Sequence, residues 1–352
     1  MSKRYGLITA LLVLILIVAG CSNANNNAGN GEKDESSGQT AGTSAKEGNL
    51  DSKASYEDVT VKIGVQGKGG LFGKAQEQKW FEEAFGEVGA RVEWVEFQSG
   101  PPMVEAMASN HLDFAGMGNM PPISAQAAGI DFKIISQLLD GKNNVAIIVP
   151  TDSPIQTIAD LKGKKVAVTK GSNAYNFLYQ VLVKAGLAKS DIQEIQLQPD
   201  ETQPSFESGK VDAWAVWDPY ITLNTLSGKG RVLADGETEG VLSPSFQLVR
   251  SDFAKEYPEL VTLYLKTFEQ ARQWEATNQE EAFQRYADER SIPIELVQGM
   301  QSRAAMVNIP VSDETIAGQQ NTADFQFELG TIRKQINVAD VFDNQYIEEA
   351  LK

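Results

Sequence analysis

The sequence of 352 residues has only one cysteine, Cys21, and only one histidine, His111. A single cysteine excludes an internal disulfide, so the stability of the folded chain has to come from its hydrophobic core. A single histidine argues against zinc sites built on histidine and against a Ser-His-Asp triad with a histidine to spare. His111 follows Asn110 at a predicted helix-to-strand turn, which is typical of a solvated loop residue. We therefore expect neither a metal nor a cofactor.

Positive charge is also scarce, because 31 Lys and Arg stand against 47 Asp and Glu, for a formal net charge of −16. Removal of residues 1–20 with a leader would take away Lys3 and Arg4 and lower the charge to −18. Such an acidic surface argues against nucleic acid as a partner and against a broad attraction to anionic lipid.

One long apolar run, from Leu7 to Val18, follows a basic start and precedes Cys21. A basic start, a short apolar segment and small residues before a cleavage point are typical of a secretory signal, which we place at residues 1–20. Val18-Ala19-Gly20-Cys21 also resembles the lipobox of bacterial lipoproteins, which predicts lipidation of Cys21 and an anchor on the extracytoplasmic face of the cell membrane. A spanning helix is disfavoured because the run is shorter than the roughly 20 residues that such a helix needs.

The polar segment 21–57 cannot bury enough apolar surface to offset the ordering of its backbone, so we expect a flexible tether. From Val59 onward the pattern changes, and apolar residues alternate as they do in strands. The first predicted helix runs from Ala75 to Phe85 with an apolar face. Strands and helices then continue to alternate, which indicates a mostly parallel, doubly wound α/β sheet.

The order of elements repeats in the second half of this region. Leu112–Ala115 and Val211–Trp214 are similar short strands, and each leads to a helix that begins at a proline, Pro121 or Pro219. Two similar α/β lobes in tandem explain this better than one large sheet. We assign residues 58–142 and 245–352 to the first lobe and 143–244 to the second. The crossings between them are predicted at Gly141–Val145 and Gly240–Phe246, because glycines and polar residues suit hinges.

The glycine-rich stretch from Gly67 to Lys74 does not match a nucleotide-binding motif. Lys68 stands where a phosphate-binding loop has its first glycine, and Ala75 replaces the Ser or Thr that holds magnesium. The dinucleotide fingerprint also fails, because Phe72 occupies the position of its third glycine. A nucleotide-binding role is therefore disfavoured.

Three loops after strand ends carry small or polar residues just before a predicted helix. The first turn of a helix has unpaired N–H groups and the positive end of the helix dipole, so it can bind an anion without a charged side chain. Ligands of open α/β sheets also collect at the carboxyl ends of strands. A single such loop is more often a helix cap, whereas several loops aimed at one cleft favour binding. The candidate residues are Ser99, Gly100, Gly118, Asn119, Met120, Ser172 and Asn173.

Four further residues complete the predicted site. Gln66, at the end of the first strand, is a candidate side-chain donor. Trp217 and Phe97 could flank the carbon part of a ligand. Asp218 either caps the helix that begins at Pro219 or faces the cleft, and both can hold.

Several motifs, in a specific order, resemble the substrate-binding proteins of ABC importers for aliphatic sulfonates, nitrate and taurine. The resemblance runs from about Val61 to the C-terminus and is closest to the sulfonate branch. Asn119-Met120 stands where acidic residues or threonine are more usual, which leaves the exact ligand open. Besides the lipobox, the motifs are Gly64-Val65-Gln66, Phe97–Pro101, Gly116–Pro122, Asp160–Lys164, Lys170–Asn173, Val211–Trp214 and Trp217–Pro219.

This resemblance implies a type II periplasmic-binding-protein fold, whose two lobes close on a small organic anion such as an alkanesulfonate. It also implies an ABC permease and its ATPase as partners, and we expect a monomer. Nitrate, taurine and a thiamine precursor stay open as ligands. An enzyme on the same fold, such as a synthase of the thiamine-pyrimidine type, would need a nucleophile, metal set or catalytic histidine that the sequence lacks. A surface protein outside transport, such as a sensor partner or adhesin, would not require loops that converge on a cleft.

Overall fold

The computed structural model describes residues 56–67 and 71–352. The predicted leader 1–20, the predicted lipidation site Cys21 and all but the end of the predicted tether 21–57 lie outside the described residues. Within the described part of the chain, no helix is both long enough and apolar enough to cross a membrane.

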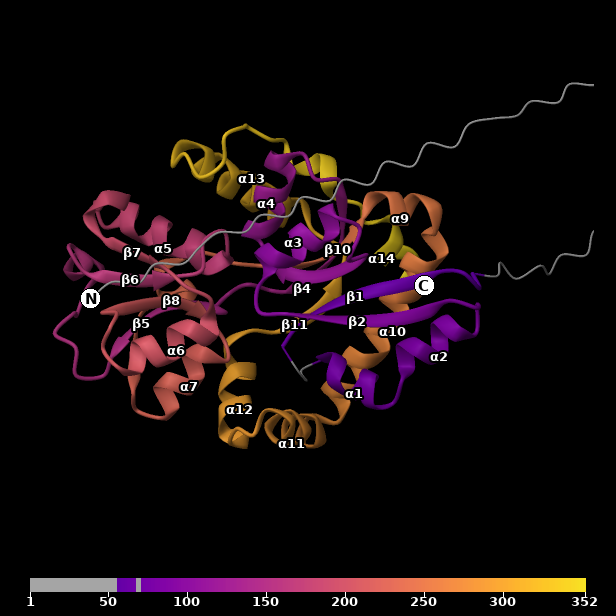
Figure 1. Cartoon of the computed structure of the whole chain (residues 1–352), viewed down its shortest axis with the longest axis horizontal. Helices are drawn as coiled ribbons and strands as arrows, with labels where there is room; N and C mark the ends of the chain where they lie inside the picture. The colour runs from indigo at the N-terminus through magenta and orange to yellow at the C-terminus, as the bar shows by residue number, and fades with distance from the viewer. Residues whose placement is uncertain (1–55, 68–70) are drawn as a thin grey trace, which may run out of the picture. The chain divides into compact units, whose positions relative to one another are not determined.

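Two separate sheets organise the described residues, and each forms the centre of one lobe (Figure 1). The first sheet contains, in spatial order, β11 (Met306–Ile309), β4 (Phe132–Leu139), β10 (Ser245–Arg250), β3 (Phe114–Gly118), β1 (Thr60–Gln66) and β2 (Arg91–Phe97). β1 is parallel to both β2 and β3, so these three strands end at the same edge. β10 runs antiparallel to β3 and β4, as does β11 to β4.

The second sheet contains, in spatial order, β7 (Gln193–Gln196), β6 (Lys165–Val168), β8 (Ala213–Trp217), β5 (Val145–Pro150) and β9 (Gly230–Asp235). β6 is parallel to β7 and β8, whereas β5 is antiparallel to β8 and β9. The first five residues of β5, Val145–Val149, are all fully buried. A continuous apolar strand of this kind fits a sheet whose two faces are both covered.

Helices cover both sheets, and their apolar faces form the cores. In the first lobe these are α1 (Leu71–Glu77), α2 (Trp80–Gly86), α3 (Gly100–Ala108), α4 (Met120–Ala128), α9 (Ser251–Glu256), α10 (Pro258–Thr277), α13 (Asp313–Glu328) and α14 (Gln345–Ala350). In the second lobe they are α5 (Asn173–Lys184), α6 (Pro199–Glu207), α7 (Tyr220–Leu226) and α8 (Gly236–Glu239). The predicted α/β fold with two doubly wound lobes is confirmed.

The first helical region differs from the single helix predicted at Ala75–Phe85. Two helices, α1 and α2, occupy it, and the chain turns between them at Lys79, whose φ of 56° is left-handed. Phe81 and Phe85 are nevertheless fully buried, as the apolar pattern of the predicted helix requires.

The chain crosses between the lobes through residues 140–144 and 240–244, at the two predicted hinges. These crossings lie against each other, because the Ser243 amide donates to the Gly141 carbonyl at 2.8 Å and the Asn144 side chain donates to the Ser243 carbonyl at 2.9 Å. Gly141 has φ of +77°, and a Cβ there would clash with the backbone of Pro244. Glycine therefore allows the two crossings to pack closely.

The C-terminal third of the chain also reaches the second lobe. α11 (Gln279–Arg290) and α12 (Ile294–Arg303) form a hairpin between the lobes (Figure 1). α12 packs on α7 so closely that a Cβ on Gly299 would lie 2.6 Å from Cγ2 of Thr222. In α13, Gln326 donates to the Asn176 side chain of α5 at 2.8 Å. The assignment of 245–352 to the first lobe alone leaves out these contacts of α12 and α13 with the second lobe. The domain boundaries stay a prediction.

Candidate functional site

A cavity of about 550 Å³ lies between the two lobes. The first lobe contributes the carboxyl ends of β1, β2 and β3, which converge because the three strands are parallel neighbours. The second lobe contributes the start of α5 and the end of β8, while α11 and α12 contribute a further wall. The cavity therefore lies at the carboxyl ends of the strands, where the ligands of open α/β sheets bind.

The structure brings eight of the eleven predicted ligand-binding residues to the lining of this cavity. They are Gln66, Phe97, Gly100, Gly118, Ser172, Asn173, Trp217 and Asp218. Six of them lie on six different strands and helices of the two lobes, and Ser172 and Asp218 lie just outside such elements. Their role toward a ligand stays a prediction.

Ser99, Asn119 and Met120 are not part of the cavity lining. The Ser99 hydroxyl is fully buried and donates to the Gln198 side chain at 3.0 Å. The Asn119 carbonyl accepts from Gln319 of α13 at 2.7 Å, and Met120 is fully buried in a small core beneath α4. All three residues have structural contacts of their own beside the cavity.

Ser172 and Asn173 mark the N-terminus of α5 at the cavity wall. The Ser172 hydroxyl accepts from the Tyr175 amide at 3.2 Å and donates to the Thr169 carbonyl at 2.7 Å. The Asn173 side-chain oxygen accepts from the Ala174 amide at 3.0 Å. Ser172 therefore caps α5, which is the alternative to ligand binding given for such a loop, and it also lies at the cavity. The positive end of the α5 dipole is consequently held at the cavity wall.

Asp218 likewise combines a cap with a place in the cavity wall. Its Oδ1 accepts from the amide and the hydroxyl of Thr222, at 2.9 and 2.6 Å, which secures the start of α7. Its Oδ2 lies 3.2 Å from Nε of Arg303, close enough for an ion pair although the two groups are not aligned as a hydrogen bond. Burial raises the pKa of Asp218, and the contacts with Thr222 and Arg303 oppose that rise.

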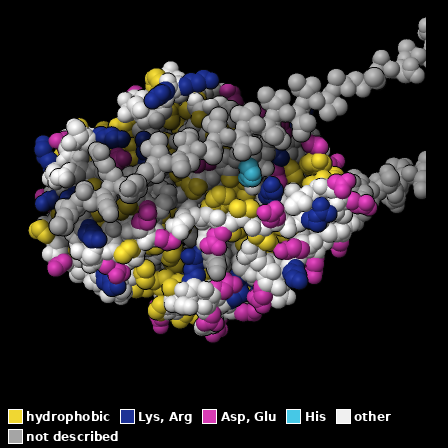
Figure 2. All heavy atoms as spheres, viewed as in Figure 1, with side chains coloured by type: hydrophobic (Ala, Val, Ile, Leu, Met, Phe, Trp, Pro, Cys, Tyr) yellow, Lys and Arg dark blue, Asp and Glu magenta, His cyan; other side chains and the backbone are white. Residues whose placement is uncertain are grey.

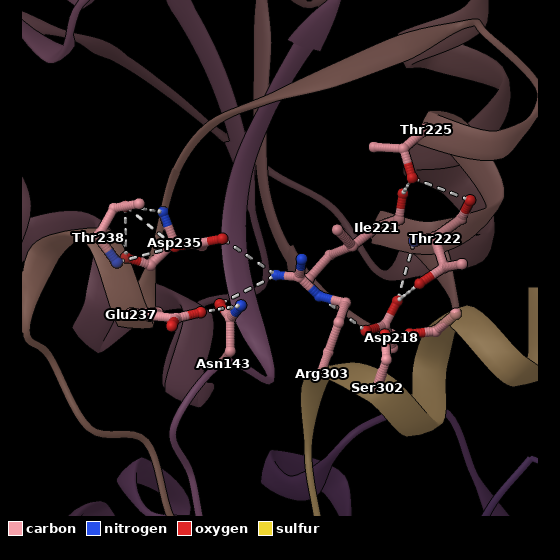
Figure 3. Close-up of polar contacts among 11 residues, drawn as sticks. Asn143, Asp218, Ile221, Thr222, Thr225, Asp235, Glu237, Thr238, Ser302 and Arg303 are labelled. Atoms are coloured by element: carbon pink, nitrogen blue, oxygen red, sulfur yellow. Dashed lines mark hydrogen bonds and ion pairs between the residues drawn. The ribbon is translucent and has the colours of Figure 1, made fainter.

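Arg303 connects the end of α12 to several parts of the second lobe (Figure 3). Besides Asp218, its guanidinium meets the Asp235 carboxylate at 3.7 Å and the Asn143 side-chain oxygen at 3.2 Å. Asn143 belongs to the first crossing and Asp235 caps α8, which precedes the second. This largely buried cation therefore links α12 to the cavity wall, to the first crossing and to the cap of α8.

The lobes also contact each other through residues outside the two crossings. Ser99 of the first lobe bonds to Gln198 of the second, and Gln98 bonds to Asp200. A Cβ on Gly118 would lie 2.7 Å from Cγ and 2.9 Å from Cβ of Asn173. The cavity is thus the space that remains when the two lobes touch.

Aromatic side chains supply much of the apolar lining. Phe72 and Phe268, whose ring centroids are 5.4 Å apart, lie on the first lobe, and Trp217 and Tyr220 lie on the second. Gln66 donates its side-chain amide to the Gly116 carbonyl at 3.0 Å, so it also ties β1 to β3. The cavity can hold a molecule with an apolar body and a polar head.

Sequence reasoning missed the wall formed by α11 and α12, which includes Tyr286, Arg290 and Met300. Arg285 pairs with Glu275 of α10 at 3.6 Å and with Glu289 at 2.5 Å, and thereby attaches α11 to α10. Burial raises the pKa of Glu275 to about 7, although Arg285 opposes the rise. The helical pattern of this segment was recognisable, but its position beside the cavity depends on packing between distant elements.

The charges on the protein are mainly negative, and acidic side chains are visible on both lobes (Figure 2). Among the described residues, no group of three or more His, Cys, Asp or Glu side chains is arranged to hold a metal ion. The fold and the cavity together define a two-lobed ligand-binding protein with the type II periplasmic-binding-protein fold.

The chain belongs to the NMT1/THI5-like family, whose model matches residues 72–282. A Bacillus subtilis (strain 168) protein named for the binding of aliphatic sulfonates is 43% identical over 292 residues, which are 83% of this chain and 88% of that protein. This relative is named as a binding protein and not as an enzyme.

Two solved structures share the whole two-lobed arrangement. The alkanesulfonate-binding protein SsuA from Xanthomonas axonopodis pv. citri, bound to MOPS, aligns with a TM-score of 0.75 and 32% identity, covering 81% of this chain and 98% of that one. The periplasmic aliphatic sulphonate binding protein SsuA from Escherichia coli aligns with a TM-score of 0.70 and 32% identity, covering 84% and 99%. The predicted resemblance to sulfonate-binding proteins is therefore confirmed.

Proposed function

We propose that this chain is the extracytoplasmic substrate-binding lipoprotein of an ABC importer, and that it binds an aliphatic sulfonate between its lobes and delivers it to the permease. The observation that carries this proposal is the cavity of about 550 Å³ built jointly by both lobes, on a chain whose relatives are named for sulfonate binding. Catalysis has no part in the proposal.

The polar end of the cavity suits a sulfonate. A sulfonate keeps its negative charge at every physiological pH, so it needs N–H donors and no proton exchange. α5, with 12 residues, begins at Asn173, and α3, with 9, begins at Gly100, and both starts lie at the cavity. The positive ends of both helix dipoles therefore lie at the cavity, and the first residue of each helix, Gly100 or Asn173, would offer its amide to the anion. Pro101 and Pro102 of α3 have no N–H, and the amides of Ala174 and Tyr175 in α5 already donate to cap side chains. Phe97 and Trp217 would then contact the carbon part of the ligand.

The size of the cavity favours an organic anion over nitrate. A four-atom ion displaces on the order of two water molecules, each with a share of about 30 Å³ of liquid volume. The cavity of about 550 Å³ would leave nitrate surrounded by water and by aromatic side chains that it cannot contact. A sulfonate with a carbon body makes use of that apolar lining.

Binding would draw on motion about the crossings at Gly141 and Pro244. Each lobe supplies part of the site, so a ligand that contacts both stabilises the closed arrangement over the open one. The contacts of Ser99 with Gln198 and of Gln98 with Asp200 belong to that closed arrangement. A permease could then distinguish the loaded protein by the relative position of the lobes.

Isothermal titration calorimetry on the full chain, purified in mild detergent, tests the ligand. We expect saturable one-to-one binding of ethanesulfonate, hexanesulfonate or MOPS, with weaker binding of nitrate and sulfate. Taurine and a thiamine precursor complete the panel. Tight binding of nitrate alone would move the assignment to nitrate uptake, and no heat with any sulfonate would contradict the proposal.

Lipidation is tested separately through Cys21, the only thiol in the sequence. We expect the wild-type chain to fractionate with membranes and to incorporate labelled palmitate, and Cys21→Ser to lose both properties. The substitution removes the acceptor sulfur and leaves the folded lobes unchanged, so sulfonate binding by the released protein is the control. Membrane retention of Cys21→Ser would show that the leader itself is the anchor.

A further inference from the structure

We propose that Met306, at the start of β11, limits the length of the carbon chain that the ligand cavity accepts, because its side chain separates this cavity from a second one. The inference rests on the proposed function and deepens it, since it concerns which sulfonates the same cavity selects. It adds a specificity-determining residue on a strand far from the helix starts considered above.

The second cavity, of about 430 Å³, is lined by the end of α10, the start of α11, the end of α12 and the start of β11. It shares three lining residues with the ligand cavity, namely Gln301, Ala304 and Met306. Gln301 is exposed and Ala304 has only a methyl group, so Met306 is the large, half-buried side chain in this common wall. The two cavities therefore adjoin at Met306.

The backbone at this position is held in place, so the side chain is the adjustable part of the wall. The Ala305 carbonyl accepts from the Asp140 amide at 3.2 Å, and Met306 pairs with Leu139 of β4. A methionine side chain is unbranched and flexible, which lets it fill an irregular gap. Truncation of Met306 should consequently open the wall without moving the strand.

A row of four residues leads across the sheet from the predicted anion site to Met306. Gly118 of β3 is opposite Ser245 of β10, Ser245 is opposite Leu139 of β4, and Leu139 is opposite Met306. All four residues line the ligand cavity. Neighbouring strands are about 4.8 Å apart, so the three steps place Met306 roughly 14 Å from Gly118 along the sheet edge.

This distance can be compared with the length of an alkanesulfonate. An extended chain of single bonds advances about 1.2 Å per bond, because three bonds of an extended backbone span at most about 3.6 Å. The six bonds from the sulfur to the last carbon of hexanesulfonate then span about 7 Å, and the ten bonds of decanesulfonate about 12 Å. With its head beside Gly118, hexanesulfonate ends short of Met306, whereas the terminal methyl of decanesulfonate meets it.

The charges of the lining leave this row free for a carbon chain. Among the described lining residues of the ligand cavity, none that is charged lies on β10, β4, α12 or β11. Beyond Met306, Ala276 and Phe283 add apolar surface to the second cavity. The charged residues there are paired, Arg272 with Glu269 at 2.6 Å and Glu275 with Arg285 at 3.6 Å. The charged residues of the ligand cavity are Glu96, Asp200, Asp218, Glu289 and Arg290.

The test is calorimetry on the full chain with hexanesulfonate and decanesulfonate. We expect Met306→Ala to bind decanesulfonate about fourfold to fifteenfold more tightly than the wild type does, and hexanesulfonate equally well. The gain corresponds to one or two further methylene groups buried, each worth about fourfold in affinity. Each ligand is compared between variants under one condition, so its partition into detergent cancels.

Met300→Ala is the matched control, because Met300 lines the ligand cavity but not the second one. We expect no gain for decanesulfonate in this variant. Met306→Val, whose branched side chain suits a strand, should show a smaller gain than Met306→Ala. It decides the question if thermal unfolding shows that Met306→Ala does not keep its fold.

The outcomes separate this inference from the proposed function. If the wild type binds no sulfonate, the proposed function fails and this inference fails with it. If the wild type binds hexanesulfonate but neither Met306 variant gains affinity for decanesulfonate, the proposed function stands and the role of Met306 is overturned. Equal gains for both ligands, or equal gains in Met300→Ala, would indicate a general loosening of the cavity and overturn that role as well.

Discussion

Arg303→Met is expected to lower the stability of the protein by about 3–5 kcal/mol, the cost of removing one partner from a buried ion pair. The side chains of Arg303, Asp218 and Asp235 are only 16%, 13% and 12% exposed, so water cannot replace the lost cation. Methionine keeps much of the length of the side chain, which confines the change to charge and hydrogen bonding. At about 2–4 °C per kcal/mol for a chain of this size, the melting temperature should fall by roughly 10 °C.

Thermal unfolding followed by circular dichroism measures this effect, with Arg272→Met as the matched control. Arg272 pairs with Glu269 within α10 and is more exposed, at 28%, so its replacement is expected to cost less than about 1 kcal/mol. Equal losses in the two variants would contradict the special role of Arg303.

The effect of Arg303→Met should also depend on pH. Burial raises the pKa of Asp218, so the folded protein disfavours the ionised carboxyl, and the stability that this group contributes falls as the pH rises through its folded-state pKa. Without Arg303, the ionised Asp218 carboxylate lowers the stability of the folded protein further, whereas the protonated form does not. We therefore expect a smaller difference between variant and wild type at about pH 5 than at about pH 8.

Gly118→Val is expected to weaken ligand binding by roughly tenfold to a hundredfold while leaving the unliganded fold intact. A Cβ at position 118 would lie 2.7 Å from Cγ and 2.9 Å from Cβ of Asn173, and the latter atom cannot rotate away. Overpacking of this kind costs about 1–3 kcal/mol. A small separation of the lobes relieves it, so the penalty falls on the closed arrangement, and each 1.4 kcal/mol is about tenfold in affinity.

Calorimetry with the best sulfonate measures this loss, and Gly318→Val is the control. Gly318 lies on α13, and a Cβ there meets no atom within 4 Å, so the same substitution adds bulk away from the cavity. Wild-type affinity in Gly118→Val would mean that the ligand does not require contact between β3 and α5.

Much of the fold could be predicted because its signals are local. Alternating apolar residues such as Val61 and Ile63 mark buried strands, and both prolines chosen as helix starts, Pro121 and Pro219, lie within or next to the first turn of a helix. The crossings were recognisable from glycines in polar segments. The break at Lys79 was not, because a left-handed lysine has no sequence signal comparable to that of glycine.

The site was predictable only in part, because its composition depends on contacts across the molecule. The loops around Gly100, Gly118 and Ser172 do reach the cavity. Ser99, however, bonds to a residue of the other lobe, and Met120 points into a core shared with the C-terminal region. Arg290 is more than two hundred positions from Gln66 along the chain, and nothing in the residues around it indicates that it meets the end of β1.

The attachment of α12 to α7 bears on how far the two lobes can move apart. α10 and β11 belong to the first lobe, while the helical hairpin between them is fastened to the second by Gly299 and Arg303. The hairpin is therefore held by both lobes at once. A wide separation of the lobes would have to detach the hairpin from α7, so we expect the protein to open only by motions small enough to keep that contact.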